Sequence, residues 1–205
     1  MRKIRTNLNR PSHLAWDWLG RNFYFFSDGY INTCNENGSW CFDLLPTGLS
    51  AINSLLVVPE EGYLFFSVWG AAMSSQTGFI ERSDLDGLRH RRIISHDSRM
   101  QQPSSLTSDV VNKKIYWTDS HMASVGVSDY NGHQRKIILS YSLSMPFGLG
   151  MYEDYLYVSN IGTDTLTKVS KFDGRSRTIF HRGNVKSESI KIVHRIAQMI
   201  GEYHK

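Results

Sequence analysis

A repeat running through the chain constrains its fold more than any other feature. An aromatic segment ending in a small hydroxyl residue and, in most copies, an acid or amide occurs at residues 24–28, 64–68, 115–119 and 156–160. An Asx-Gly pair follows each segment, with glycines at positions 38, 87, 132 and 174, at intervals of 49, 45 and 42 residues. A period of about 40 to 45 residues is typical of the four-stranded blades of a β-propeller.

Short apolar segments complete each unit. One precedes the aromatic segment, at residues 12–17, 54–58, 105–109 and 147–151, and another follows the turn pair, at residues 42–45, 93–94, 137–139 and 179–180. Each unit therefore contains four predicted antiparallel strands, because an Asx-Gly pair joins two strands by a tight hairpin. The sequence predicts an all-β chain of about four blades, at residues 11–45, 46–95, 102–140 and 145–181.

The repeated positions are expected to do the same structural job in every blade. A blade packed on both faces can be apolar throughout, and rings such as Tyr116 and Trp117 would fill the wedge between neighbours. The hydroxyl and acid would bond backbone groups at the strand end, although Val68 and Asn160 replace the acid in two units. The residues given these roles are Tyr24, Ser27, Asp28, Phe65, Ser67, Tyr116, Trp117, Thr118, Asp119, Tyr157, Ser159 and Asn160, with the turn glycines Gly38, Gly87, Gly132 and Gly174.

The sequence resembles the class B repeat of the LDL-receptor family, also called the YWTD repeat. Residues 116–119 spell Tyr-Trp-Thr-Asp, and residues 14–22, 80–87 and 145–157 resemble other stretches of such blades. The likeness covers about residues 11–181, and the cysteine hairpin is most similar to the LDL-receptor-related proteins. The family's propellers have six blades, and the four units here match the third to the sixth.

The resemblance implies a non-enzymatic, extracellular interaction or scaffold module of an endocytic receptor. Such a module would bind or release protein ligands, with EGF-like and class A modules as neighbours in a membrane-anchored parent. A propeller of the Wnt-coreceptor or matrix-adhesion type is an alternative with the same fold. A propeller hydrolase would instead need acids and amides from several blades to converge on the central channel.

Catalytic chemistry is not indicated by the residues. Four acids could be imagined to supply a carboxylate pair for hydrolysis. They recur in register, and this favours a structural role, since catalytic acids are not normally copied from unit to unit. These acids are Asp17, Asp28, Asp109 and Asp119. The eight histidines are scattered and match no zinc-binding pattern. We therefore predict no enzyme, no cofactor and no metal site.

The two cysteines flank a turn signal. Cys34 and Cys41 enclose Asn37-Gly38, a pair typical of a type I′ hairpin that would bring the flanking strands together. We expect a disulfide, although two reduced thiols would be ordinary in a cytosolic protein. Asn37-Gly38-Ser39 is also a candidate N-glycosylation sequon on a predicted loop.

Charge and hydropathy exclude two classes of partner. The net charge of +4 is dispersed, and its densest part, around Arg89, Arg91 and Arg92, lacks the continuous stripe of a nucleic-acid surface. No apolar run approaches the length of about 20 residues that a membrane helix needs, and residues 1–10 do not form a signal peptide. The extracellular location is therefore inferred from the family resemblance, the disulfide and the sequon.

The two ends and the tryptophans complete the predictions. Residues 1–10 are expected to be a remnant of a preceding blade or disordered, and residues 182–205 a closing strand to about His194 with a tail that is partly helical. Four blades of a six-bladed ring would leave apolar flanks unpaired, which predicts a poorly soluble fragment. Most tryptophans are expected in the blade cores, and Trp40 is the candidate for exposure.

Overall fold

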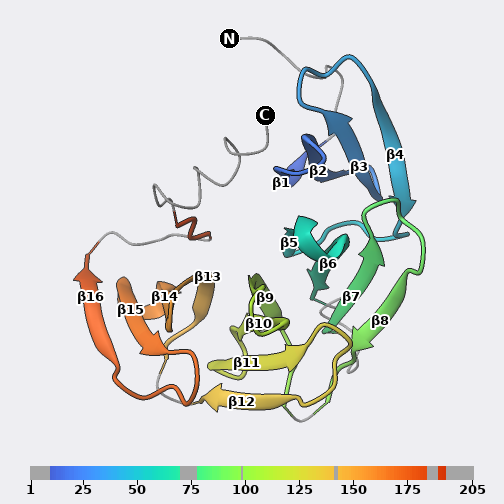
Figure 1. The fold of residues 1–205 in the computed structure, drawn as a ribbon. Helices are drawn as coiled ribbons and strands as arrows, with labels where there is room; N and C mark the ends of the chain where they lie inside the picture. Colours follow the sequence, from blue (N-terminus) through green and yellow to red (C-terminus); the bar gives the residue numbers. More distant parts are fainter. Residues whose placement is uncertain (1–9, 70–77, 98, 141–142, 184–188, 193–205) are drawn as a thin grey trace.

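The computed structural model describes residues 10–69, 78–97, 99–140, 143–183 and 189–192, and it contains four antiparallel sheets of four strands each (Figure 1). The first two sheets comprise β1 (Ser12–Asp17), β2 (Asn22–Ser27), β3 (Tyr30–Asn35), β4 (Cys41–Pro46), β5 (Ser54–Val58), β6 (Tyr63–Val68), β7 (Phe79–Asp84) and β8 (Arg91–Ile94). The other two comprise β9 (Pro103–Asp109), β10 (Lys114–Asp119), β11 (Ser124–Asp129), β12 (Lys136–Leu139), β13 (Pro146–Tyr152), β14 (Tyr155–Asn160), β15 (Thr165–Ser170) and β16 (Thr178–Arg182). Within each sheet the strands lie in sequence order.

The four sheets stand around a common centre as the blades of a propeller (Figure 1). Strands β1, β5, β9 and β13 are innermost, and each contacts the next. Strands β4, β8, β12 and β16 form the outer rim. The predicted all-β, partial-propeller fold is confirmed, and the described residues add only two single 3₁₀ turns, at Pro59–Glu61 and Ile161–Thr163. We number the sheets as blades one to four along the chain.

The strand directions define two faces of the propeller. In blade one, Asp17 at the end of β1 pairs with Asn22, and Asn22 pairs with Asn35 at the end of β3. The innermost strand and the third strand of a blade therefore end on the same side, which we call the lower face. The side on which β1, β5, β9 and β13 begin is the upper face.

The hydrophobic core is divided among the three joints between blades. Leu64 and Phe66 of β6 pack in the cluster between blades one and two, while Phe65 between them packs in the cluster that faces blade three. Tyr116 and Trp117 divide in the same way, Trp117 toward blade two and Tyr116 toward blade four. Because successive strand residues point to opposite sides of a sheet, one aromatic segment wedges both neighbouring blades.

The Asx-Gly turns pack against the preceding blade. Gly132 and Gly174 have φ of 84° and 70°, in the left-handed region that favours glycine. A Cβ atom on Gly132 would clash with the carbonyl oxygen of Ile93, and one on Gly174 with that of Ile138. These residues belong to the outer strands of blades two and three. Glycine is therefore required at these positions for two reasons, the left-handed turn conformation and the close approach of two blades.

The chain ends depart from the predictions or lie outside the described residues. Ser189–Ile192 have no strand assignment, so the predicted closing strand is not formed there, although they pass close to Gly148 and Gly150 of β13. The predicted helix in the tail and most of residues 1–10 fall outside the described residues. Over the part of the chain that is described, no helix is long and apolar enough to span a membrane.

The tryptophans are less buried than predicted. Trp117 is fully buried, but Trp16, Trp18 and Trp69 are half-buried. Trp40 is 45% exposed, as expected, and its ring stacks on Phe42 at a centroid distance of 5.4 Å. Trp16 lies next to the end of β1, and Trp18 and Trp69 directly follow β1 and β6.

Candidate functional site

A pocket of about 410 Å³ opens where the innermost strands begin, on the upper face. Four blades contribute to it, since its walls include His13 of β1, Leu55 of β5, Ser105 of β9 and Phe147 of β13. The remaining lining residues are Leu14, Asn53, Ser54 and Ser189. A pocket shared by several blades near the axis is a natural place for a ligand, because it collects side chains from distant parts of the chain.

The polar groups of the pocket are held by neighbouring strands. Asn53 Oδ1 accepts a hydrogen bond from the Trp69 backbone N–H at 2.8 Å, and Ser54 Oγ accepts one from the Leu106 N–H at 3.1 Å. The Trp69 ring meets Phe147 edge-on at a centroid distance of 5.6 Å. The site is thus an apolar and aromatic wall with a few fixed amide and hydroxyl groups, which suits binding by shape and hydrogen bonding.

The described lining of the pocket lacks the acids that the proposed alternative, a hydrolase built around a central metal, would need. Its described lining contains no Asp, Glu, Lys or Cys, and no group of three or more His, Cys, Asp or Glu in the described part of the chain could hold a metal. Asp17, Asp109 and Asp119 lie elsewhere and bond backbone N–H groups instead. The convergence of acids on the axis that would favour the hydrolase alternative is therefore not found among the residues described.

Two hydroxyls of the repeat link the second strand of one blade to the innermost strand of the next blade. Ser67 Oγ donates to the carbonyl oxygen of Ser104 at 2.8 Å, and Thr118 Oγ1 donates to that of Phe147 at 2.6 Å. In blade four, Ser159 Oγ accepts from the Gly148 N–H at 2.8 Å, within its own sheet. Ser67 and Thr118 thus hold β9 and β13, which line the pocket, against the preceding blades.

The acid position of the repeat differs between blades. Asp119 is fully buried and accepts four backbone hydrogen bonds, from Gln101 and Gln102 at Oδ2 and from His121 and Met122 at Oδ1. Asp28 at the same position is exposed, and its only bond with another described residue joins Oδ2 to Ser27 Oγ at 3.0 Å. Within the described part of the chain, the expected hydrogen bonds from the Asp28 carboxylate to the backbone are therefore not formed.

The two units without the acid use other groups. In blade two, where Val68 replaces the acid, Asn53 Oδ1 takes the following backbone N–H, that of Trp69. In blade four, Asn160 is buried and its Nδ2 donates to Thr167 Oγ1 at 2.9 Å. An amide oxygen thus replaces the carboxylate as an acceptor in blade two, whereas in blade four Asn160 only donates and its buried Oδ1 has no hydrogen-bond partner among the described residues.

Buried cations at the joints were not found by sequence reasoning. Lys171 of blade four reaches Asp109 of blade three, and Arg82 of blade two donates to the backbone oxygen of Tyr130 in blade three at 3.1 Å. Burial lowers the pKa of Arg82, and the nearby charge of Arg91 adds to this effect. Arg135 makes two 2.9 Å hydrogen bonds to the carboxylate of Asp97. Of these three cations, only Arg135 has a feature in the sequence that could have pointed to a structural role, which is its position three residues after the turn glycine Gly132.

The tyrosines of the repeat are buried against the next blade. The Tyr24 hydroxyl donates to the carbonyl oxygen of Leu85 in blade two at 3.1 Å. Burial, with a contribution from the charge of Asp17, raises the pKa of Tyr24 to about 12. Burial also raises the pKa of Tyr116 to about 12. Both phenols therefore stay neutral and keep their hydrogen-bonding proton at physiological pH.

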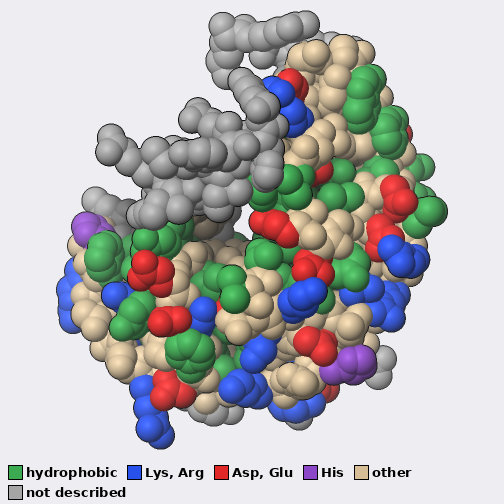
Figure 2. Space-filling view, in the orientation of Figure 1, with side chains coloured by type: hydrophobic (Ala, Val, Ile, Leu, Met, Phe, Trp, Pro, Cys, Tyr) green, Lys and Arg blue, Asp and Glu red, His purple; other side chains and the backbone are tan. Residues whose placement is uncertain are grey.

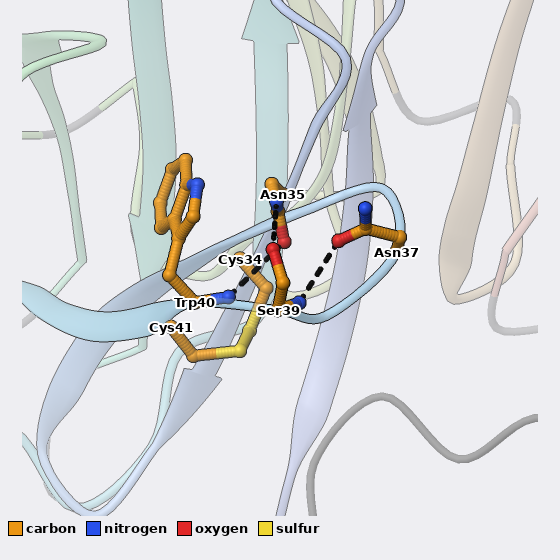
Figure 3. The surroundings of a disulfide bond; sticks show 6 residues. All are labelled: Cys34, Asn35, Asn37, Ser39, Trp40 and Cys41. Carbon is orange, nitrogen blue, oxygen red and sulfur yellow. Dashed lines mark hydrogen bonds between the residues drawn. A yellow bond between two sulfur atoms is a disulfide. The ribbon is translucent and has the colours of Figure 1, made fainter.

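The cysteine hairpin closes as predicted, with a disulfide between Cys34 and Cys41 (Figure 3). Cys34 ends the buried part of β3 and Cys41 begins β4, so the bond clamps the hairpin at the edge of blade one. Asn35 Nδ2 donates to Ser39 Oγ at 2.7 Å, and Asn37 Oδ1 accepts from the Ser39 N–H at 2.9 Å (Figure 3). The turn is therefore fixed both covalently and by side-chain hydrogen bonds.

Charges are mixed over the surface. On the face shown in Figure 2, acidic and basic side chains are interspersed and form no continuous basic stripe. Arg89 pairs with Asp84, Arg92 pairs with Glu81, and Arg91 bonds Asn131. The densest basic stretch is thus largely neutralised by its neighbours.

Comparison with known proteins agrees with the fold and the repeat. Residues 113–150 match the family model described as low-density lipoprotein receptor repeat class B. The chain is 32% identical over 194 residues to the vitellogenin receptor Yl of Drosophila melanogaster and 25% identical over 198 residues to the vitellogenin receptor of Solenopsis invicta. Each match covers 93% of this chain, but the chain spans only 9% and 10% of the two relatives.

Solved structures show the same architecture. A structure of a nidogen/laminin complex matches with a TM-score of 0.75 at 22% identity, over 86% of this chain and 65% of that chain. A nutrient-binding protein from Bacteroides thetaiotaomicron matches with a TM-score of 0.65 at 11% identity, over 85% of this chain and 43% of that chain. At these identities the likeness is one of fold. With the tetrapeptide at residues 116–119, these matches show that the chain contains the LDL-receptor class B (YWTD) repeat and folds as four blades of a propeller.

Proposed function

We propose that the chain is part of the extracellular, ligand-binding region of an endocytic receptor, and that its upper-face pocket receives a protein ligand. The observation that carries the proposal is the pocket itself, which four blades build from apolar and hydrogen-bonding groups. The receptor relatives support the protein class, and the disulfide supports an oxidising compartment outside the cytosol.

The relatives also suggest a first ligand to test. Both are vitellogenin receptors, so vitellogenin of the source animal is the probe we propose. Binding in the upper pocket would be followed by uptake, with release in acid as part of the same cycle. EGF-like and class A modules are the proposed neighbours in the parent.

A charge placed in the pocket tests the proposal. Ser105→Arg in the full-length receptor puts a bulky cation into the pocket wall from β9, and we expect it to weaken vitellogenin binding about tenfold or more. Val111→Arg is the matched control, since it adds the same charge to the same blade at a residue that follows β9 on the lower face and is 91% exposed. Surface plasmon resonance at neutral and mildly acidic pH gives both affinity and release.

The outcomes separate the pocket from the rest of the surface. Loss of binding with Ser105→Arg alone supports the upper-face site. Equal binding by both variants and the unmodified receptor would overturn it, and a loss with Val111→Arg alone would move the site to the lower face.

A further inference from the structure

We infer that Asn37 carries an N-linked glycan, which the fold displays on the lower rim of the propeller, away from the upper pocket. The inference rests on the proposed extracellular function, because the modification occurs in the secretory pathway. Asn37-Gly38-Ser39 is the only Asn-X-Ser/Thr sequon in the sequence. The structure adds accessibility, orientation and the relation to neighbouring blades.

The acceptor nitrogen is free to react. Asn37 is exposed at the tip of the β3–β4 hairpin, and its Oδ1 accepts from the Ser39 N–H, while no described residue accepts a hydrogen bond from its Nδ2. Figure 3 shows the amide oxygen of Asn37 turned to Ser39 and the amide nitrogen on the opposite side of the group. In the reaction, Nδ2 loses one proton and bonds the anomeric carbon of an oligosaccharide carried on a polyprenyl diphosphate. The lipid diphosphate leaves with the electron pair of the broken C–O bond.

The corresponding positions in the other blades show that a neighbouring blade would not cover this side chain. Asp86, Asn131 and Asp173 precede the turn glycines of blades two, three and four, and all three are exposed. Yet each of these turns packs on the preceding blade, through Gly87, Gly132 and Gly174 against its outer strand. The residue before the glycine therefore points to solvent even where a blade lies behind the turn.

The topology separates the glycan from the ligand. Asn37 follows β3, whose last residue, Asn35, pairs with Asn22 beside the end of β1. The pocket lies at the opposite end of β1, at His13. A glycan on the lower rim would thus leave the pocket open, so its removal is expected to leave vitellogenin binding unchanged within twofold.

The experiment is to secrete the full-length receptor ectodomain from animal cells and treat it with peptide N-glycosidase in ¹⁸O-labelled water. We expect Asn37 to be recovered as ¹⁸O-labelled Asp by mass spectrometry. Asn37→Gln and Ser39→Ala should abolish the label, whereas Ser39→Thr, which keeps the sequon, should retain it. His133→Ser creates the same sequon on the corresponding turn of blade three and should add a second labelled site at Asn131.

The results decide the inference independently of ligand binding. A secreted, folded receptor with unlabelled Asn37 would overturn it, whatever the receptor binds. A labelled Asn37 whose loss through Asn37→Gln weakens vitellogenin binding more than twofold would overturn the separation of glycan and pocket. If Asn37 is labelled but Ser105→Arg leaves vitellogenin binding unchanged, the glycan is confirmed and the proposed ligand site is rejected.

Discussion

Lys171 of blade four reaches across the joint to Asp109 of blade three, with Nζ 2.9 Å from Oδ2 and side chains only 8% and 3% exposed. Asp109 also accepts hydrogen bonds from the backbone N–H and side-chain Nδ2 of Asn112. One carboxylate thus fixes the β9–β10 turn and fastens the next blade to it. The joint between blades three and four depends on a buried ion pair as well as on its hydrophobic cluster.

Removing the cation should therefore loosen this joint. Lys171→Met leaves the Asp109 carboxylate buried without its ionic partner, and we expect a loss of about 3 kcal/mol in the free energy of unfolding. Lys136→Met is the control, because Lys136 is exposed at the same joint and, among the described residues, donates only to the Phe172 carbonyl at 3.4 Å. That variant should stay within about 0.5 kcal/mol. Denaturant unfolding of the full-length protein measures both, and equal effects would contradict a special role for the buried pair.

Much of the fold could be predicted because its signals are local. An aromatic segment and an Asx-Gly pair recurring at a blade-length period define four hairpin-connected sheets. The alternation of Tyr116 and Trp117 toward opposite joints follows from the two-residue period of a strand. The Cys34–Cys41 bond followed from the turn signal between the two residues.

The features that sequence reasoning missed depend on contacts between distant segments. Nothing near Lys171 identifies Asp109 as its partner, since the residues that follow the third strand at the same position in blades two and three are Leu85 and Tyr130. The pocket likewise arises from the starts of four separate strands. Asp28 and Asp119 have the same motif position, yet among the described residues only Asp119 accepts hydrogen bonds from backbone N–H groups of a preceding linker. Position in a repeat predicts a role only where the surrounding loop is also repeated.

That difference between the two acids gives a second prediction. In Asp119→Asn, two of the four backbone N–H groups would face an amide NH₂ instead of an oxygen, and we expect a loss of about 2 to 3 kcal/mol. Asp28→Asn, at the same motif position but exposed, should change the free energy of unfolding by less than about 0.5 kcal/mol. Parallel urea titrations measure both. A similar cost for the two variants would mean that the motif acid has one role in both blades.

The turn glycines give a third prediction. Gly132→Ala would combine a left-handed φ of 84° with a clash against the Ile93 carbonyl, so we expect a loss of at least 2 kcal/mol. Gly48→Ala has a similar φ of 66° but nothing within 4 Å of the added methyl, and should cost about 1 kcal/mol. The difference in melting temperature between the two isolates the cost of pushing two blades apart. Equal shifts would show that the turn conformation alone explains the glycine.

The disulfide gives a fourth prediction. It closes a short loop with a sequence separation of 7, and replacing both cysteines by alanine should cost about 2 to 3 kcal/mol through the greater entropy of the unfolded chain. Adding reductant should lower the free energy of unfolding of the unmodified protein by this amount. It should leave that of the double variant unchanged, so the double variant is the control. A scan of unfolding with and without reductant measures it. An equal response of both proteins to reductant would place the effect outside this hairpin.

The last prediction concerns acid. Burial alone would raise the pKa of Asp109, but the hydrogen bonds from Asn112 and Lys171 outweigh it and hold the pKa below its usual value. In Asp97, burial is likewise outweighed, by the Arg99 backbone N–H and by the charge and hydrogen bonds of Arg135. A carboxyl with a depressed pKa contributes stability that is complete above its unfolded-state pKa of about 3.9 and is lost as pH falls through the folded-state pKa.

The joints should therefore hold from neutral pH to about pH 5 and weaken below about pH 4. Asp109→Asn removes one of these carboxyl groups. The free energy of unfolding of this variant should be lower at neutral pH, and below pH 4 it should fall less steeply with pH than that of the unmodified protein. Asp28→Asn, which changes an exposed acid, should keep the full steepness. Urea titrations at a series of pH values measure the slopes. Identical slopes for all three proteins would show that Asp109 does not couple protonation to the joint between blades three and four, because only a group whose pKa differs between the folded and unfolded states contributes to the slope.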